Sequence, residues 1–464
     1  MTTKVTIHST AVKSATLYAL ACLMAGAAFG QATVTLSRVS GPPTSTVTVS
    51  GNGFSPNATI NIYFDIAKTT STVSDAAGSF ATPLQIPATG QPGGHRVTAI
   101  ASATAVKAQQ GFLIQTNWSE VGFNPAGNRA NPYENTLSSA TVGSLSLHWK
   151  YGSGNAVFSS PAIANGMVYV GSEDNHIYAL SATTGQARWS YATGNWVDSS
   201  PAIANGVVYA GSLDNSLYAL NADTGAKIWS FATGAQIYSS PAVAGGLVFV
   251  GSSDDNVYAL NAATGAKRWR FTGGSWMWSS PAVTNGVVYI GCGDNNVYAL
   301  NASTGAKLWS FATGNAVVSS PAVSNGVVYV GSYDGYVYAL NATTGAEMWK
   351  FATGNAVQSS PAIANGVVYV GSFDSNVYAL DALSGALRWS FTTGAFVNSS
   401  PAVANGVVYV GSLDNNVYAL DANTGAKLWS YATGGFVQSS PAVANGVLYV
   451  GSSDNSVYSF TAAK

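Results

Sequence analysis

Short apolar runs alternate with turn residues along most of this chain, at a spacing typical of β-strands. In the segment from Ser199 to Gly234 (SSPAIANGVVYAGSLDNSLYALNADTGAKIWSFATG), the runs end at Asn-Gly, Asp-Asn and Thr-Gly pairs. Asn-Gly and Asp-Asn at two-residue hairpin positions favour turns that match the twist of paired strands. The pattern therefore predicts four strands in this segment and the residues just before it: Val197–Ala204, Val207–Gly211, Ser216–Asn221 and Lys227–Ala232.

This segment recurs every forty residues with few changes. The tetrad SSPA begins eight copies, at Ser159, Ser199, Ser239, Ser279, Ser319, Ser359, Ser399 and Ser439. A period of this length is typical of solenoids and propellers, and four short antiparallel strands make one propeller blade. We therefore predict an all-β fold with an eight-bladed β-propeller over residues 145–464.

The two ends of the repeat region complement each other. The last copy stops at Val457–Phe460 without a strand that carries Trp, whereas Leu147–Tyr151 (LHWKY) places such a strand before the first copy. We expect this N-terminal strand to complete the last blade, because an unpaired sheet edge is a template for aggregation. The Pro of each SSPA is expected on the innermost strand, where a free edge toward the channel needs no backbone donor.

Residues 32–116 differ from the repeats. Thr46–Ser50 and Thr59–Phe64 alternate in polarity and predict strands of a small β-sandwich. The run Val49–Pro56 (VSGNGFSP), with Gly78-Ser79-Phe80 and Pro87 further on, resembles the IPT/TIG-type immunoglobulin-like (Ig-like) domains of bacterial surface proteins. The resemblance implies a spacer that holds the repeats away from a surface, with an independent binding role as the alternative.

Residues 1–31 are predicted to be an export signal. Lys4 and Lys13 precede the apolar segment Ala15–Phe29, and Gly30 and Ala32 fit a small-residue cleavage site. A lipidated Cys22 is the alternative to loss of this cysteine with the signal. The protein is thus expected in the periplasm, at the cell surface or outside the cell.

Residues 117–144 form a collar between these two regions. The collar is not repetitive and contains Trp118, Phe123 and Tyr133. Aromatic side chains at this density are costly to leave in water, so we expect the collar to pack against the repeat domain.

Composition narrows the classes of partner. Only 8% of the residues are charged and the net charge is −1. No basic stripe suggests nucleic acid, and no apolar stretch after residue 30 is long enough to span a membrane. Cys292 is the one cysteine beyond the signal, in a position that is Ser in the other copies, so an internal disulfide is excluded and a buried Ser replacement is favoured over a reactive thiol. We expect a monomer whose ligand is a protein or a polysaccharide.

The pattern GxVYVGSxDxxVYALxAxTGxxxW resembles the PQQ-like (pyrroloquinoline quinone) repeat, a relative of WD40 and YVTN repeats. It occurs in quinoprotein dehydrogenases and in the barrel-assembly lipoprotein B of Gram-negative bacteria. The resemblance implies that each Trp docks on a neighbouring blade near the Gly of the Thr-Gly turn. The Trp residues are Trp149, Trp189, Trp229, Trp269, Trp309, Trp349, Trp389 and Trp429, and the glycines are Gly185, Gly225, Gly265, Gly305, Gly345, Gly385 and Gly425.

The copies differ mainly on one face of the predicted ring. In a four-stranded meander, the Asn-Gly and Thr-Gly turns share one face, and the links between blades share the other with the Asp hairpins. Before each Ser-Ser pair the copies carry, in turn, Ala156/Phe158, Trp196/Asp198, Gln236/Tyr238, Trp276/Trp278, Ala316/Val318, Ala356/Gln358, Phe396/Asn398 and Phe436/Gln438. Around the hairpin Asp they carry pairs that include Glu173/His176, Leu213/Ser216, Tyr333/Tyr336 and Phe373/Asn376.

An aromatic and polar surface around a channel suits ligand recognition, although drift at tolerant loop positions would give the same variation. The ligand-binding residues predicted on this variable face are Phe158, Glu173, His176, Trp196, Asp198, Tyr238, Trp276, Trp278, Tyr333, Tyr336, Phe396 and Phe436.

Catalytic and metal sites find little support. The hairpin aspartates miss the calcium-loop spacing and fit Asx turns, so no metal site is predicted. His148 and His176 have no nucleophile or Asp at triad spacing, so no catalytic residue is predicted. The family resemblance implies PQQ with calcium, but the adjacent cysteine pair that accompanies the quinone is absent, and no cofactor is predicted.

The sequence therefore predicts an exported, non-enzymatic propeller that binds a protein or polymer through its variable face. Two alternatives remain: a PQQ-dependent alcohol dehydrogenase with an altered site, and a scaffold for assembly of outer-membrane proteins. The extra Ig-like region counts against the scaffold.

Overall fold

The structure is a computed structural model that describes residues 31–463. All but the last residue of the predicted export signal lies outside this range. Within it, no helix is long and apolar enough to cross a membrane. The chain forms two compact units: a small one that includes Thr48–Leu84 and Arg96–Gln110, and a large one that includes Gly111 and all that follows.

The N-terminal β region consists of two sheets. One has the order β1-β3-β6, from Thr33–Leu36, Thr46–Asn52 and Phe80–Gln85. The other has the order β2-β8-β7-β4-β5, from Ser40–Gly41, Lys107–Ile114, Gly93–Ala101, Thr59–Phe64 and Ala67–Val73. The two strands predicted here are β3 and β4, and the alternation in β4 buries Ile60, Ile62 and Phe64. A separate β region therefore precedes the repeats, as predicted.

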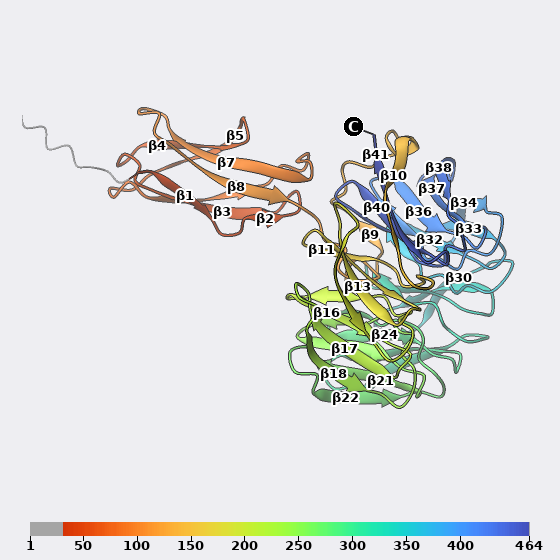
Figure 1. The fold of residues 1–464 in the computed structure, drawn as a ribbon. Helices are drawn as coiled ribbons and strands as arrows, with labels where there is room; N and C mark the ends of the chain where they lie inside the picture. The colour runs from red at the N-terminus through yellow and green to blue at the C-terminus, as the bar shows by residue number, and fades with distance from the viewer. Residues whose placement is uncertain (1–30, 464) are drawn as a thin grey trace, which may run out of the picture. The chain divides into compact units, whose positions relative to one another are not determined.

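The repeat region forms eight four-stranded antiparallel blades, one of which gains a short parallel fifth strand, β9 (Ala130–Asn131), beside β35 (Figure 1). The first strands are β11 (Ala162–Ala164), β15 (Ala202–Ala204), β19 (Ala242–Ala244), β23 (Ala282–Thr284), β27 (Ala322–Ser324), β31 (Ala362–Ala364), β35 (Ala402–Ala404) and β39 (Ala442–Ala444). The second strands are β12 (Met167–Ser172), β16 (Val207–Gly211), β20 (Leu247–Gly251), β24 (Val287–Gly291), β28 (Val327–Gly331), β32 (Val367–Gly371), β36 (Val407–Gly411) and β40 (Val447–Ser452).

The outer half of each blade is equally regular. The third strands are β13 (His176–Ser181), β17 (Ser216–Asn221), β21 (Asn256–Asn261), β25 (Asn296–Asn301), β29 (Tyr336–Asn341), β33 (Asn376–Asp381), β37 (Asn416–Asp421) and β41 (Ser456–Ala462). The fourth strands are β14 (Ala187–Ala192), β18 (Lys227–Ala232), β22 (Lys267–Thr272), β26 (Lys307–Ala312), β30 (Glu347–Ala352), β34 (Leu387–Thr392), β38 (Lys427–Ala432) and β10 (Leu145–Gly152). A short 3-10 helix, η1 (Val142–Ser144), precedes β10.

One predicted strand is too long. In the second repeat, β16, β17 and β18 have the predicted bounds, but β15 begins at Ala202 instead of Val197. The reason is that the polar groups of Val197–Ser200 bond to neighbouring blades. The amide of Ser200, for example, donates to Ser240 Oγ at 2.9 Å. These residues form a link between blades, and Pro201 lies just before the strand.

The ring closes as predicted. Strand β10 pairs antiparallel with β41, from Leu145 opposite Ala462 to Gly152 opposite Ser456 (Figure 1). The second Ser of each SSPA accepts a hydrogen bond from the matching amide of the preceding copy, and the last amide, of Ser440, donates to Ser160 Oγ at 3.0 Å. The eight blades are therefore joined into a continuous ring at the channel.

Each repeat Trp seals one blade to the next at the outer side. Trp189 Nε1 donates to the carbonyl oxygen of Ala222 at 2.9 Å, and the other seven Trp residues make the same kind of bond at 2.9–3.0 Å. Gly225 has φ +72°, and a Cβ at this position would lie 2.7 Å from the Trp189 ring. The Thr-Gly turn therefore needs glycine both for its backbone conformation and for the approach of the Trp.

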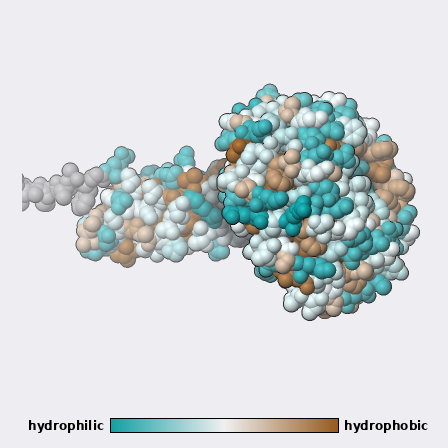
Figure 2. All heavy atoms as spheres, turned by 90° about the horizontal axis from the view of Figure 1, so that it is seen from below, coloured by the Kyte–Doolittle hydropathy of each residue, from teal (hydrophilic) through white to brown (hydrophobic). Residues whose placement is uncertain are grey.

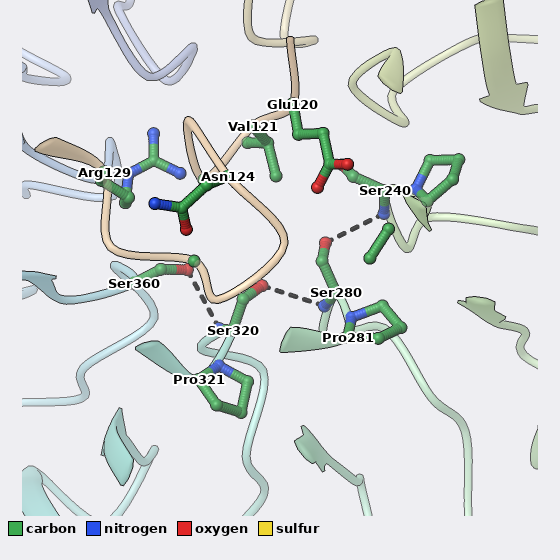
Figure 3. Close-up of a pocket in the computed structure, with 14 residues that line it drawn as sticks. Glu120, Val121, Asn124, Arg129, Ser240, Ser280, Pro281, Ser320, Pro321 and Ser360 are labelled. Carbon is green, nitrogen blue, oxygen red and sulfur yellow. Dashed lines mark hydrogen bonds between the residues drawn. The ribbon is translucent and has the colours of Figure 1, made fainter. Parts of the chain in front are cut away.

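Residues 118–131 of the collar form a plug that lines the channel. The prediction of a free inner edge on each blade is therefore wrong, because the plug bonds to the first strands. The plug carbonyls of Trp118, Ser119, Pro125, Ala126, Asn128 and Arg129 accept hydrogen bonds from amides of six of the eight first strands, all except β19 and β39. Glu120 Oε1 bonds to Val243, and Asn131 Nδ2 to Val443, so the plug touches every blade. Figure 3 shows the plug loop with Ser240, Ser280, Ser320 and Ser360 along one side of it.

The outer edge of the ring carries its positive charge. From Leu145 to residue 463, every Lys and Arg lies in a fourth strand, the outermost of its blade. Basic side chains on an edge strand hinder pairing with another sheet. Apolar residues such as Ile228 and Leu308 are exposed on the same strands, and Figure 2 shows apolar patches interspersed with polar areas on the visible face.

Deletion of Leu145–Gly152 is expected to abolish cooperative unfolding of the propeller. The deletion leaves the third-strand edge at β41 unpaired and removes the Leu145 carbonyl to which Trp429 donates. Scanning calorimetry of the full chain and of the deletion variant measures the effect. An unchanged melting transition would show that β10 does not close the ring.

Candidate ligand-binding funnel

The eight links bring one side chain per blade together at the mouth of the channel. They surround a cavity of about 320 Å³. We call this cavity the funnel. Its wall consists of the residues that immediately precede each Ser-Ser pair, Phe158, Asp198, Tyr238, Trp278, Val318, Gln358, Asn398 and Gln438, with Ser160, Ser400 and Ser440 of the serine ring beneath them.

The alternation within each link points these residues inward. In the second link, Trp196 is 43% exposed, Val197 is fully buried and Asp198 lines the funnel. The residue in the Val197 position packs against the Gly at the end of the second strand: a Cβ on Gly211 would lie 2.3 Å from Ile237 Cγ2. Because the side chain at the Val197 position is buried against this Gly, the residue before it faces outward to the rim and the residue after it faces inward to the funnel.

Four of the predicted binding residues line the funnel: Phe158, Asp198, Tyr238 and Trp278. Trp276 packs against Trp278, with ring centroids 4.3 Å apart and ring planes tilted by 32°. Three further predicted residues, Trp196, Phe396 and Phe436, stand on the surrounding rim and are 43–53% exposed.

The predicted residues from the Asp hairpins divide into two groups. Glu173 influences Asp198 electrostatically, and Tyr333 donates its hydroxyl to Gln358 Oε1 at 2.6 Å, so both belong with the funnel. His176 and Tyr336 instead begin third strands and lie outside the lining of the funnel. His176 Nδ1 contacts the Asp174 backbone at 3.0 Å, and Tyr336 lies under Lys350, 5.4 Å from Nζ to the ring centre.

The prediction omitted half of the funnel wall, namely Val318, Gln358, Asn398 and Gln438. Their side chains are neither aromatic nor charged, whereas the predicted binding residues are all aromatic or ionisable. Only their position in the sequence identifies these residues: each lies one residue before a Ser-Ser pair.

An aromatic stack fills one part of the wall. Trp278 lies between Trp276 and Tyr238, whose centroids are 4.3 Å and 4.8 Å away, and its Nε1 donates to Ser253 Oγ at 2.8 Å. Gly293 replaces the side chain that other copies carry before the hairpin Asp, since a Cβ there would lie 2.5 Å from Trp276. The stack is therefore fixed in place before any ligand arrives.

Asp198 dominates the electrostatics of the funnel. Burial, with a smaller contribution from the neighbouring Glu173, raises the pKa of its carboxyl to about 7. Burial also raises the pKa of Glu173 and of Tyr238, and the two carboxylates add to the shift of Tyr238. Asp198 Oδ1 is buried without a hydrogen-bond partner, and no basic residue lines the cavity. Asp198 ionises at about pH 7, and above this pH the funnel favours positive charge.

The repeated aspartates are structural. Asp214 Oδ1 accepts the Ser216 amide at 2.9 Å, which is an Asx turn, and its Oδ2 accepts the Tyr218 hydroxyl and the Gly194 amide, both at 2.7 Å. The other copies repeat the bonds to Tyr and Gly. Their carboxylates are thus occupied, and residues 31–463 contain no group of three or more acidic, His or Cys side chains suited to a metal.

Cys292 is an inert replacement for serine. Its Sγ contacts the Ser275 carbonyl oxygen at 3.2 Å, as Ser212 Oγ contacts that of Asn195 in another copy. Burial raises the pKa of the thiol to about 12, so the nucleophilic thiolate does not form at neutral pH.

The funnel does not fit PQQ. This quinone bears three carboxylate groups, whereas the charged side chain in the funnel wall is the acidic Asp198, with Glu173 beside it. A calcium ion beside the quinone would need several oxygen ligands, and the hairpin carboxylates already bond to their own blades. The donor set thus disagrees with the cofactor that the repeat pattern implies.

The variant Asp198→Asn is expected to flatten the pH dependence of stability. The raised folded-state pKa keeps Asp198 protonated while the unfolded chain ionises, so this residue lowers stability by about 1 kcal/mol per pH unit from roughly pH 4 to pH 7. Thermal unfolding across this range, with Asp223→Asn at an exposed turn as the control, measures the difference. Parallel curves for wild type and Asp198→Asn would contradict the assigned burial.

Comparison with known proteins identifies the repeat family. The family described as outer membrane protein assembly factor BamB matches residues 134–212, 192–309, 293–400 and 374–464. No curated protein matches the chain.

Solved structures share the propeller at low sequence identity. BamB from Moraxella catarrhalis is 20% identical with a TM-score of 0.61, over 68% of this chain and 99% of that one. Quinohemoprotein alcohol dehydrogenase from Comamonas testosteroni is 17% identical with a TM-score of 0.67, over 75% and 81%. A europium-containing methanol dehydrogenase is 16% identical with a TM-score of 0.64, over 75% and 98%. Such likeness shows the fold, and the family match shows more: this chain belongs to the family of the outer membrane protein assembly factor BamB, propellers built from PQQ-like repeats.

Proposed function

We propose that this protein is an exported, non-enzymatic propeller that binds a protein or polymer ligand in the funnel and on its rim. The observation that carries the proposal is the convergence of the variable positions. The eight copies differ most in the links, and one link residue from each copy lines the same cavity. Drift alone does not account for a preformed aromatic stack at tolerant positions.

The repeated residues have structural partners, which leaves recognition to the variable ones. The Ser-Ser pairs and Trp residues bond between blades, and the Asp residues bond within hairpins and to links. The funnel residues and the exposed rim aromatics Trp196, Phe396 and Phe436 are not needed for these bonds. Aromatic side chains that are held rigid and partly exposed are typical anchors in binding interfaces.

A scaffold role in the cell envelope is the second candidate. The match to the BamB family over residues 134–464 favours it, and so does an export signal at the N-terminus. Envelope location is part of both candidates. The N-terminal β region, interpreted as an Ig-like domain, would serve either one as a spacer or as a second binding module.

A quinoprotein dehydrogenase is the weakest candidate. It rests on the likeness of the fold to alcohol and methanol dehydrogenases, and the acidic funnel opposes an anionic quinone.

The triple variant Trp196→Ala, Trp276→Ala, Trp278→Ala is expected to lose ligand capture and keep its fold. Peptide and glycan arrays probed with the labelled protein measure capture, and calorimetry checks folding. Leu383→Ala, at an 81% exposed position in a Thr-Gly-type turn, is the matched control on the opposite face. Array ligands that bind the triple variant as well as the wild type would refute the assignment of the face.

Titration with PQQ and calcium chloride is expected to give no saturable binding. The acidic funnel repels the carboxylates of the quinone, as described above. Absorbance and calorimetric titrations of the full chain measure binding, and a dye-linked alcohol oxidation assay measures activity. Saturable binding accompanied by oxidation would establish the dehydrogenase and overturn the binding role.

A further inference from the structure

We propose that the funnel receives a cationic side chain, lysine or arginine, from a polypeptide ligand, and that Asp198 is its counter-ion. This inference rests on the proposed function, because it specifies the chemistry of the ligand that the same funnel binds.

The position of Asp198 provides the first argument. Phe158 and Tyr238 come from the links on either side of its own, so the carboxylate lies in the wall between two aromatic residues. Its Oδ1 is buried and has no hydrogen-bond partner. A buried acceptor without a partner costs free energy, which an entering N–H donor would recover.

Charge provides the second argument. Glu173 adds a second carboxyl close to Asp198, and the cavity lining contains no basic residue. The Lys and Arg residues of the ring lie in the fourth strands, at the far edge of each blade. The plug places one buried cation in the channel, Arg129, whose Nε donates to the Pro401 carbonyl oxygen at 3.0 Å and which does not line the funnel. An ammonium or guanidinium group therefore meets Asp198 in the funnel without a basic residue in the surrounding wall.

The aromatic residues favour a cation over a sugar. Rings attract a cation through their faces, and Phe158 and Tyr238 are within the same wall as Asp198. A sugar would need an open ring face on which to stack. Trp278 in the wall has Tyr238 and Trp276 close to it, with ring centroids 4.8 Å and 4.3 Å away, and the more exposed aromatic rings stand on the rim outside the funnel.

The opposite half of the funnel suits a peptide backbone. Gln358, Asn398 and Gln438 come from consecutive links and face the Phe158–Trp278 half across the ring. Side-chain amides both donate and accept, as peptide groups do. The Tyr333 hydroxyl occupies Gln358 Oε1, so this side chain presents its amide nitrogen to a ligand carbonyl. A cavity of about 320 Å³ holds one long side chain with the adjoining backbone.

The test uses dye-labelled decapeptides with one Gly-Ser framework and three variable central positions. The peptides differ in the residue at these positions: Lys or its neutral analogue norleucine, Arg or its neutral analogue citrulline, or Glu. Fluorescence anisotropy with the full chain is expected to show binding of the Lys or Arg peptide about tenfold or more tighter than of its neutral analogue, the range for a hydrogen bond to a charged group. In Asp198→Asn this preference should vanish, and in the control Asp223→Asn it should persist.

The outcomes separate this inference from the proposed function. Equal binding of Lys and norleucine peptides to the wild type, or a preference that persists in Asp198→Asn, would overturn the cation site and leave the binding role intact. Calorimetric titration with neutral chitohexaose provides the glycan arm, and binding of this sugar in the funnel without binding of any peptide would also overturn it. Array ligands that bind the aromatic triple variant as well as the wild type would instead refute the proposed function itself.

Discussion

The bonds between neighbouring blades determine the rest of this structure. A blade of four short strands has two edges and two apolar faces, and one blade alone cannot bury those faces. Here the Ser-Ser pair joins each blade to the next at the channel, and the Trp-to-carbonyl bond joins them at the outer side. Because the chain supplies its last blade from both ends, these bonds continue around the ring without a break.

This division of labour explains why function can concentrate in so few residues. The serine, aspartate, tyrosine and tryptophan of each copy bond to backbone or to one another, and change at any of them would disturb two blades. The side chains of the link residues just above the serine ring take no part in these repeated bonds. Trp278 and Gln358 bond to Ser253 and Tyr333, which are themselves variable. They can differ from blade to blade, which turns a nearly eightfold-symmetric ring into an asymmetric funnel, aromatic and acidic on one half and rich in amides on the other.

The sequence was sufficient to predict the architecture. Periodicity predicted the second, third and fourth strands of the repeat. The strand that carries Trp149 precedes the first copy, which indicated how the ring closes. The first strand was overextended because Val197–Ser200 are apolar and small like strand residues, although their polar groups bond to other blades. The plug was not predicted as such, since residues 118–131 have no periodicity and their carbonyl contacts to six of the blades leave no trace in side-chain type.

The candidate site was predicted in part for a related reason. Aromatic and charged residues stand out in a sequence, which identifies Asp198 and Trp278, whereas Gln358 and Val318 have no such character. His176 and Tyr336 were included because their copies vary, but a third-strand position places them toward the outer part of the blade. Which variable residues share a cavity depends on the ring geometry and not on residue type.

Hydrogen–deuterium exchange of the full chain, with and without a ligand selected on the arrays, is the most direct test of where this protein binds. Protection is expected in the links, above all at residues 156–158, 196–198, 236–238 and 276–278, and not in the Asn-Gly and Thr-Gly turns. Protection confined to those turns, or to strands of the N-terminal β region, would contradict a binding role for the funnel.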